Sequence, residues 1–308
     1  MQITTVTMNP TIDKSSRVAR VVAERKLRCE PPVFEPGGGG INVCRAIRNL
    51  GGASLAVFPA GEGHTGRFFK ALIEDEDLTY RAVPVKTRTR ESLMIYETST
   101  GQQYRFGMPG QELAAEDWQA CLEAMFQVDP TPDYLVASGS LPPGAPENFY
   151  ALMAERCRAQ SIRLVVDTSG DPLCRAAEAG VFLLKPNLNE LQTLAGCELD
   201  EEADQEEIVR SLVDEGRSRY VVLSLGAAGV LAASETGIER LRAPTVKIQS
   251  KVGAGDSTLA GITLKLSQGA GFREAVIYGV AAGAAAVMTP GSELCRGDDV
   301  ERLVQRMA

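Results

Sequence analysis

Residues 35–52 read EPGGGGINVCRAIRNLGG, where four consecutive glycines lead into a segment with the apolar spacing of an amphipathic helix. A short apolar run at 55–59 follows this helix, as a buried strand would. The same alternation extends along the chain, with further strands predicted at 3–8, 134–137, 163–166, 182–184 and 220–224, and helices at 41–50, 67–74, 114–126, 146–159, 189–195 and 205–215. This order predicts an α/β fold whose mostly parallel sheet is covered by helices on both faces.

Two segments interrupt the alternation. Residues 13–33 and 88–106 alternate polar and apolar side chains without an intervening helix, and the second contains SLMIYETSTGQQYRF with a hairpin-like STG turn. We expect these lid strands to form a small sheet that covers a site and joins two chains into a homodimer. The Ala- and Gly-rich stretch 253–288 predicts two closely packed helices, and we expect residues 1–308 to form one domain.

Composition excludes several classes of protein. The chain has 40 acidic against 32 basic residues, a net charge of −8, which disfavours nucleic-acid binding. Its seven cysteines form no C-x-x-C pair, which argues against a disulfide framework or structural zinc. The chain has a single histidine, His64, which argues against histidine-based nucleophilic catalysis. Without a signal peptide or an apolar run of membrane-spanning length, we expect a cytoplasmic protein that does not bind membranes.

The four glycines of 37–40 are the first candidate site. Free backbone N–H groups at the following helix start carry partial positive charge, and glycine lets a polar ligand approach the backbone. Asn42, in the first helical turn, could hydrogen-bond a sugar hydroxyl. The alternative is a flexible loop, but four glycines cost backbone entropy that packing alone rarely justifies.

The stretch GEGHTG at 61–66 matches the dinucleotide-binding fingerprint G-x-G-x-x-G. That motif belongs in the first strand-to-helix turn, whereas here an earlier strand, glycine loop and helix have already passed. We therefore favour a structural turn with an exposed His64 over a nicotinamide site.

The stretch KVGAGDS at 251–257 places an acid at the start of a long Ala- and Leu-rich helix. Successive N–H groups of the Gly-Ala-Gly turn can surround developing negative charge, and the adjacent carboxylate of Asp256 can accept a proton. This pairing suits phosphoryl transfer, although no P-loop sequence is present. The alternative is ordinary N-capping by Asp256.

The stretch KPNLNE at 185–190 follows a predicted strand, at the sheet edge where α/β proteins bind ligands. Asn187 and Glu190 lie three residues apart and could offer oxygen ligands to a magnesium ion that retains most of its water. The alternative is that the acid caps the helix start.

Seven stretches together resemble the ribokinase-like, or PfkB, family of sugar kinases, and within it the branch that acts on phosphosugars. The resemblance covers nearly the whole chain. Its stretches occur in the family's order: KLRCEPPVFEPGGGGINVCRAI (26–47), GQQYRFGMPG (101–110), ASGSLPPG (137–144), VVDTSG (165–170), LLKPNLNE (183–190), VVLSLGAAG (221–229) and VGAGDS (252–257). The resemblance implies a three-layer ribokinase-like core with a β-sheet lid. It also implies ATP-dependent phosphorylation of the C1 hydroxyl of fructose 6-phosphate.

Three other activities remain open. Tagatose-6-phosphate kinases and 1-phosphofructokinases share much of the same pattern, so the choice of phosphosugar is less specific than the family. From another class, the rival is a catalytically silent sensor of a sugar phosphate or nucleotide.

The resemblance also implies roles for individual residues. Asp256 would take the hydroxyl proton, beside an anion hole of Gly253, Ala254 and Gly255. The sugar hydroxyls would be held by Asp13, Gly38, Gly39, Asn42 and Ser140, and the sugar's phosphate by Arg90, aided by Lys26 or Arg28 from the lid. The nucleotide side would comprise Lys185, Asn187, Ser224, Gly226 and Gly229, with Asn187 and Glu190 reaching magnesium through water.

Members of this family often bind potassium through backbone oxygens, here near Val252, Ala286 and Gly291. Thr289 and Glu293 depart from the family's pattern and weigh against potassium activation. Lys251 is a further departure, because relatives usually carry a small residue such as Thr there. A cation at this position could aid the transferring phosphoryl group or point to solvent.

Overall fold

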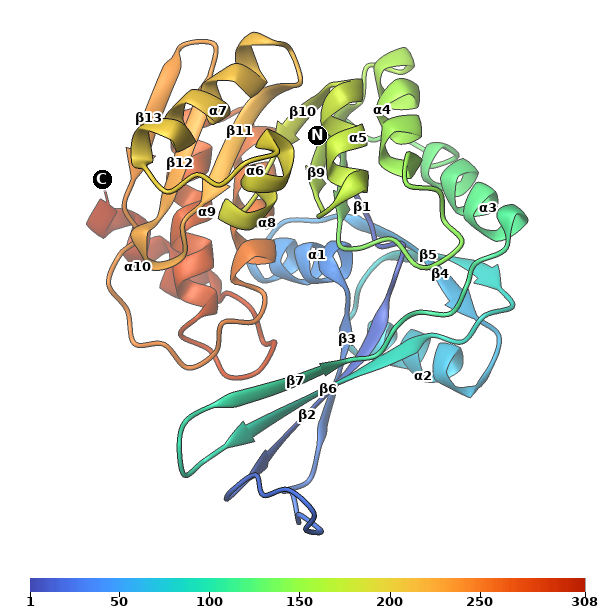
Figure 1. Cartoon of the computed structure of the whole chain (residues 1–308). Helices are drawn as coiled ribbons and strands as arrows, with labels where there is room; N and C mark the ends of the chain where they lie inside the picture. Colours follow the sequence, from blue (N-terminus) through green and yellow to red (C-terminus); the bar gives the residue numbers. More distant parts are fainter. Residues whose placement is uncertain (308) are drawn as a thin grey trace.

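A nine-stranded sheet forms the centre of the protein, whose computed structural model describes residues 1–307 (Figure 1). The strand order is β13-β12-β11-β10-β9-β8-β1-β4-β5. In chain order the strands are β1 (Ile3–Val6), β4 (Leu55–Gly61), β5 (Tyr80–Val85), β8 (Tyr134–Ser138), β9 (Arg163–Asp167), β10 (Val181–Leu184), β11 (Ser218–Ser224), β12 (Val230–Ser234) and β13 (Gly237–Leu241). All neighbours from β5 to β11 are parallel, and β12 and β13 add an antiparallel edge.

The parallel strands are short runs of β-branched and aliphatic residues because both of their faces are covered. One face packs against α1 (Gly39–Asn49), α2 (His64–Asp75), α8 (Ala254–Ser267), α9 (Phe272–Ala286) and α10 (Gly297–Met307). The other packs against α3 (Ala115–Phe126), α4 (Phe149–Ala159), α5 (Asp171–Ala179), α6 (Leu188–Ala195) and α7 (Glu202–Asp214). The predicted α/β fold with a mostly parallel sheet is confirmed.

A second sheet of four strands, here named the lid sheet, projects from the body of the protein (Figure 1). Its order is β3-β2-β6-β7, from β2 (Thr11–Val18), β3 (Val33–Gly37), β6 (Arg90–Glu97) and β7 (Gln103–Gly107). Strands β2 and β6 are parallel, although about 80 residues separate them, and the STG segment makes the predicted turn between β6 and β7.

The structure differs from the expectation for residues 13–33, because 19–32 lie outside any strand. This loop combines a cluster of charged residues with the consecutive prolines Pro31 and Pro32, which lack the N–H that a sheet requires.

The GEGHTG stretch forms the turn from β4 into α2, as expected. A Cβ on Gly66 would lie 1.8 Å from the Gly61 carbonyl oxygen, so the glycines serve close packing within the turn. His64 is exposed. No helix within residues 1–307 is both long and apolar enough to cross a membrane.

Candidate active site

The glycine stretch seats the start of α1 against the carboxyl ends of β1 and β8. Gly38 precedes the helix with φ +114°, which side chains rarely adopt, and a Cβ on Gly39 would lie 2.3 Å from Ser138 Oγ. The stretch is therefore a fixed contact between helix and sheet, and the alternative of a flexible loop does not hold. The free N–H groups of the first turn of α1 lie at the sheet edge where α/β proteins bind ligands.

Asp256 lies in the first turn of α8 but does not cap it. The N-cap residue is Gly253, and no side chain caps this helix. Instead, Asp256 Oδ2 accepts a hydrogen bond from Asn42 Nδ2 at 2.9 Å, and Oδ1 accepts one from Ser138 Oγ at 3.4 Å. The carboxylate is thus held between α1 and β8, and the N-capping alternative is wrong.

The surroundings of Asp256 make it a stronger base than an ordinary aspartate. Burial raises its pKa from 3.8 to about 6, and the nearby Asp167 carboxylate adds to the rise. Hydrogen bonds from Asn42 and Ser138 and the charge of Lys185 act in the opposite direction. At neutral pH the group is mostly ionised, with a pKa near that required of a general base.

The turn before α8 has the geometry expected of an anion hole. Gly253 has φ +72°, and a Cβ added to it would lie 2.1 Å from Leu294 Cδ2. Glycine at 253 therefore satisfies both the left-handed backbone and the close approach of Leu294. The N–H groups of Gly253, Ala254 and Gly255 lie at the positive end of a 14-residue helix.

Lys185 has a charged partner that the sequence did not indicate. Its Nζ lies 3.0 Å from Asp167 Oδ2, and the side chain is only 5% exposed. Burial lowers the pKa of Lys185, but the charges of Asp167 and Asp256 outweigh that effect, so the net shift is upward. Lys185 thus remains a cation directly behind Gly255, whose Cβ would lie 3.4 Å from Nζ.

The residues predicted for the sugar phosphate gather where the lid sheet meets the core. Asp13 is on β2, and Arg90 begins β6, its Nε and Nη2 donating to the Asn9 carbonyl at 3.3 and 3.2 Å. Asn9 Nδ2 in turn donates to Ser140 Oγ at 3.2 Å. Burial raises the pKa of Asp13 to about 6, against the lowering effect of Arg90.

A cavity of about 210 Å³ lies under the lid sheet at this point. It is lined by Asp13, Lys14, Ser15, Ser92, Leu93, Met94, Arg105, Phe106, Gly107, Val252 and Ser292. Arg105 was missed from the sequence. No signal in the sequence indicated it, because the register that pairs Arg105 with Met94, and Met94 with Ser15 on β2, is set by the folded sheet.

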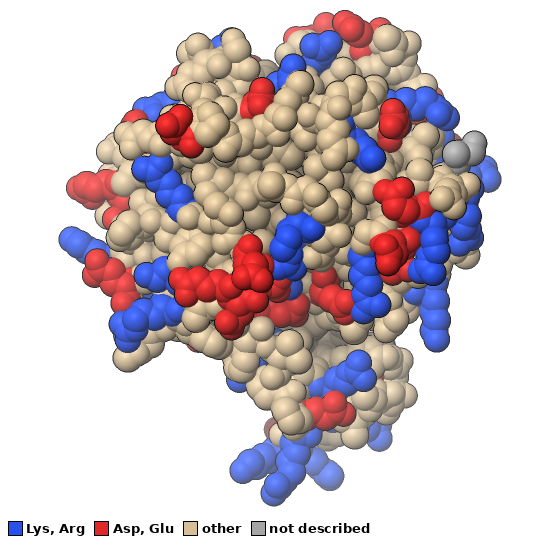
Figure 2. Space-filling model, turned by 180° about the vertical axis from the view of Figure 1, so that it is seen from behind, with Lys and Arg blue, Asp and Glu red and all other residues tan. Residues whose placement is uncertain are grey.

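The structure adds a contact for Asn42 and departs from the expectation for Lys26 and Arg28. Asn42 was expected to bind a sugar hydroxyl; its amide nitrogen engages Asp256, and its buried Oδ1 has no hydrogen-bond partner among the described residues. Lys26 and Arg28 are exposed in the loop 19–32, at the far end of the lid sheet from Asp13. Basic side chains gather at that end of the molecule (Figure 2), so within one chain Lys26 does not join the sugar-binding candidates.

The nucleotide-side candidates lie at the carboxyl ends of β10 and β11. Ser224 Oγ donates to the Pro186 carbonyl at 3.2 Å, and Asn187 forms a bridge with Ser224. Gly226 begins a single helical turn and Gly229 follows it, with φ values of +58° and +100°. These contacts place the KPNLNE and SLGAAG stretches side by side.

Asn187 and Glu190 form a capping box at the start of α6. Asn187 Oδ1 accepts from the Glu190 N–H at 3.0 Å, and Glu190 Oε2 accepts from the Asn187 N–H at 2.8 Å. The capping alternative is therefore correct, and it leaves the other oxygen of Glu190 available. Burial raises the pKa of Glu190, and Asp167 adds to that rise as it does for Asp256.

This concentration of carboxylates fits a magnesium ion bound through water. Within residues 1–307 no three acidic, histidine or cysteine side chains form a direct metal cage. Magnesium retains several waters in such sites and needs only one or two carboxylates.

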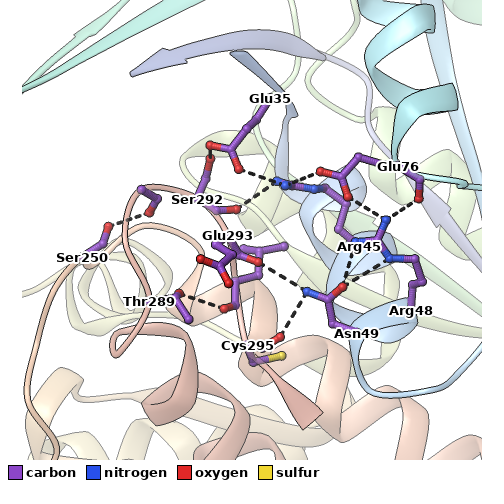
Figure 3. A network of polar contacts seen from close by, with 12 residues as sticks. Glu35, Arg45, Arg48, Asn49, Glu76, Ser250, Thr289, Ser292, Glu293 and Cys295 are labelled. Atoms are coloured by element: carbon purple, nitrogen blue, oxygen red, sulfur yellow. Dashed lines mark hydrogen bonds and ion pairs between the residues drawn. The ribbon is translucent and has the colours of Figure 1, made fainter. Parts of the chain in front are cut away.

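Two of the carbonyls predicted to bind potassium, those of Ala286 and Gly291, already accept hydrogen bonds. Thr289 Oγ1 donates to the Ala286 carbonyl at 2.8 Å. Ser250 Oγ donates to the Gly291 carbonyl at 2.7 Å (Figure 3). Val252, two residues after Ser250, donates its N–H to Ser250 Oγ at 3.2 Å. A carbonyl oxygen has a second lone pair, so these contacts leave potassium coordination open.

Comparison with known proteins gives one family. The model of the pfkB family carbohydrate kinases matches residues 6–298. The chain is 42% identical to the ATP-dependent 6-phosphofructokinase isozyme 2 of Mycobacterium tuberculosis, over 100% of this chain and 90% of that protein. Two crystal structures of phosphofructokinase-2 from Escherichia coli each cover 99% of both chains: the complex with potassium (TM-score 0.95, 40% identity) and the complex with fructose-6-phosphate (0.93, 39%).

Proposed function

This chain belongs to the pfkB family of carbohydrate kinases, and on that premise we propose that it is an ATP-dependent 6-phosphofructokinase, converting fructose 6-phosphate to fructose 1,6-bisphosphate. The observation that carries the proposal is the buried carboxylate of Asp256, which is held by Asn42 and Ser138 beside the turn of Gly253–Gly255. Base and anion hole stand together at one helix start, as phosphoryl transfer to a hydroxyl requires.

In the proposed reaction, Asp256 takes the proton of the C1 hydroxyl while that oxygen attacks the γ-phosphorus of ATP. The bond from the γ-phosphorus to the β,γ-bridging oxygen breaks, and ADP leaves with that oxygen. The N–H groups of Gly253, Ala254 and Gly255 stabilise the charge on the transferring group, and Lys185 adds a fixed positive charge behind them. Positioning and electrostatics thus supply most of the rate enhancement.

The sugar phosphate would bind between the lid sheet and the start of α1. Asp13, Gly38, Gly39, Asn42 and Ser140 would hold its hydroxyls. Arg90, at the start of β6, would grip the 6-phosphate with its planar guanidinium, which suits bidentate binding of phosphate oxygens.

The nucleotide would lie along Lys185, Ser224, Gly226 and Gly229. Asn187 and the free oxygen of Glu190 would hold magnesium through water; the ion would neutralise phosphate charge. Val252, Ala286 and Gly291 are the proposed potassium site. That proposal is supported by the likeness to the E. coli enzyme whose structure contains potassium.

We also propose that the protein forms a homodimer through the lid sheet in the cytoplasm. Four large apolar side chains on this part of the chain are exposed, at 37% for Leu27, 57% for Val33, 47% for Phe106 and 51% for Met108. Apolar area of this kind marks an interface. A dimer would also bring Lys26, remote from the site of its own chain, toward that of the partner. Sedimentation as a monomer of one chain at micromolar concentration would contradict this.

The test of function is a coupled ADP-release assay with MgATP and a panel of sugars: fructose 6-phosphate, tagatose 6-phosphate, fructose 1-phosphate, fructose and ribose. We expect the highest kcat/KM for fructose 6-phosphate. A preference for tagatose 6-phosphate or fructose 1-phosphate would retain the chemistry and change the substrate. Absence of turnover with every sugar would refute the kinase proposal in favour of a silent sensor.

A further inference from the structure

A polar cluster next to the cavity under the lid sheet joins three separate parts of the chain (Figure 3). Arg45 on α1 is at its centre, with 4% of its side chain exposed. Its Nη2 lies 3.0 Å from Glu35 Oε1 on β3, and its Nη1 donates to the Ser292 carbonyl at 3.0 Å. Ser292 Oγ closes the triangle by donating to Glu35 Oε2 at 2.6 Å.

One corner of this triangle, Glu35, belongs to the lid sheet. Glu35 pairs in register with Asp13 on β2 and lies two residues before Gly37, the end of β3, after which the chain enters the glycine turn of α1. Asp13 and Ser292 both line the cavity under the lid sheet. A shift of the lid strands must therefore move Glu35 relative to Ser292.

Another corner of the triangle, Ser292, lies on the loop that packs under the anion hole. Ser292 is two residues before Leu294, whose Cδ2 occupies the space that a Cβ of Gly253 would need. Asn49, also on α1, holds the same loop by donating to the carbonyls of Glu293 and Cys295 at 3.3 and 3.1 Å. The loop cannot move without disturbing the packing under Gly253.

Arg45 is anchored at a third point outside both binding regions. Its Nη2 also lies 2.6 Å from Glu76 Oε1, at the end of α2, and Arg48 binds the same carboxylate at 2.6 Å. Burial raises the pKa of Glu76, but the two guanidinium groups outweigh it, so its net shift is downward. Glu76 is thus a fixed anion that holds Arg45 in place while the lid and the loop adjust.

We propose that Arg45 is a positioning residue that couples the two substrates, because it ties lid strand β3 through Glu35 to the loop under the anion hole through Ser292. The proposal rests on the proposed function. When the sugar phosphate orders the lid strands, the triangle fixes the loop and hence Gly253, so the nucleotide binds more tightly. By linkage the nucleotide strengthens sugar binding by the same factor.

The test measures this factor directly by calorimetry on the full chain. The Kd of a non-hydrolysable β,γ-imido analogue of MgATP is measured with and without saturating fructose 6-phosphate. If the turnover assay identifies another sugar phosphate as the substrate, that compound replaces fructose 6-phosphate, so a wrong substrate assignment does not affect the outcome.

The variants are Ser292→Ala, which removes the hydrogen bond from Ser292 Oγ to Glu35, and Glu35→Ala, which removes the contacts of Glu35 with both Arg45 and Ser292. Both variants leave Arg45 its Glu76 partner. The matched control is Ser218→Ala, because Ser218 is also buried and donates one hydroxyl hydrogen bond, to the Tyr220 carbonyl at 2.6 Å, near the opposite edge of the sheet. Thermal unfolding of all three reports any general loss of stability.

We expect the sugar phosphate to lower the Kd of the analogue about fivefold or more in the wild type and in Ser218→Ala. In Ser292→Ala and Glu35→Ala the factor should fall below about twofold, while the Kd of the analogue alone changes less than about threefold. The inference is overturned if the wild-type factor is one, if both triangle variants keep the wild-type factor, or if Ser218→Ala loses it to the same extent.

Discussion

Replacing Asp256 by Asn should make the protein more stable while it slows catalysis. The substitution removes the carboxylate that accepts the sugar proton, and loss of a general base lowers kcat by roughly two to four orders of magnitude. The same carboxylate is buried and held near Asp167, which is an unfavourable place for its charge. Asn has nearly the same shape without that charge.

The size of the stabilisation follows from the pKa of Asp256. A rise from 3.8 to about 6 corresponds, at about 1.36 kcal/mol per pH unit, to a cost of about 3 kcal/mol for the ionised form in the folded protein. Because the folded state binds the proton more tightly than the unfolded state, this group lowers stability as pH rises from 3.8 through 6. The cost is complete at pH 7 and above, and falls to about 1 kcal/mol at pH 4.5.

The assay is denaturant unfolding of wild type and Asp256→Asn at pH 7.5 and 4.5, beside ADP release at pH 7.5. We expect the variant to gain up to about 3 kcal/mol at the higher pH and about a third of that at the lower. The control is Glu147→Gln, an exposed carboxylate for which the change should stay within about 0.5 kcal/mol. A variant less stable than wild type at both pH values would refute the electrostatic reasoning, and one with near-normal kcat would refute the catalytic role.

Four further outcomes are expected. Arg90→Ala should raise KM for the sugar phosphate about 10- to 100-fold with little change in kcat, because the phosphate is remote from the reacting hydroxyl; an unchanged KM would exclude this contact. Gly253→Ala should destabilise the fold by about 2–4 kcal/mol in denaturant unfolding and lower kcat, since its φ is +72° and its Cβ would lie 2.1 Å from Leu294 Cδ2. The value of kcat/KM should fall with decreasing pH below about 6, as Asp256 and Asp13 become protonated, and a flat profile from pH 5 to 8 would contradict both assignments. Potassium should raise the rate above that in a large organic cation at matched ionic strength, and equal rates would remove the proposed potassium site.

The sequence predicted the central strands and most helices, because buried parallel strands are short apolar runs and the helices show regular apolar spacing. It missed β5, whose Pro84 is typical only of an edge strand, β12, whose residues VLAAS include two alanines, which are depleted in strands, and β13, whose residues GIERL contain two charged side chains. Helix α5 was also missed, because it is short and begins with Asp171 and Pro172, a sequence typical of a turn.

For the site, local motifs were sufficient to identify Asp256 and the glycine turns but not their neighbours. Asn42 lies 214 residues from Asp256, and only the packing of α1 against α8 and β8 brings its amide to the carboxylate. The pairing of Lys185 with Asp167 and the position of Arg105 depend likewise on strand order and register. Side-chain partners of this kind are set by tertiary structure, which no single motif encodes.

The order of the proposed roles along the chain has an evolutionary consequence. The residues assigned to the sugar phosphate all precede residue 141, whereas those assigned to the nucleotide and to the anion hole follow residue 184. The residues that bind the phosphoryl acceptor and those that bind the phosphoryl donor are therefore encoded by successive parts of the gene. Recombination between relatives within that interval would transmit a new sugar preference with an unchanged nucleotide site, provided that the contacts of Asn42 with Asp256 and of Arg45 with Ser292 are inherited intact.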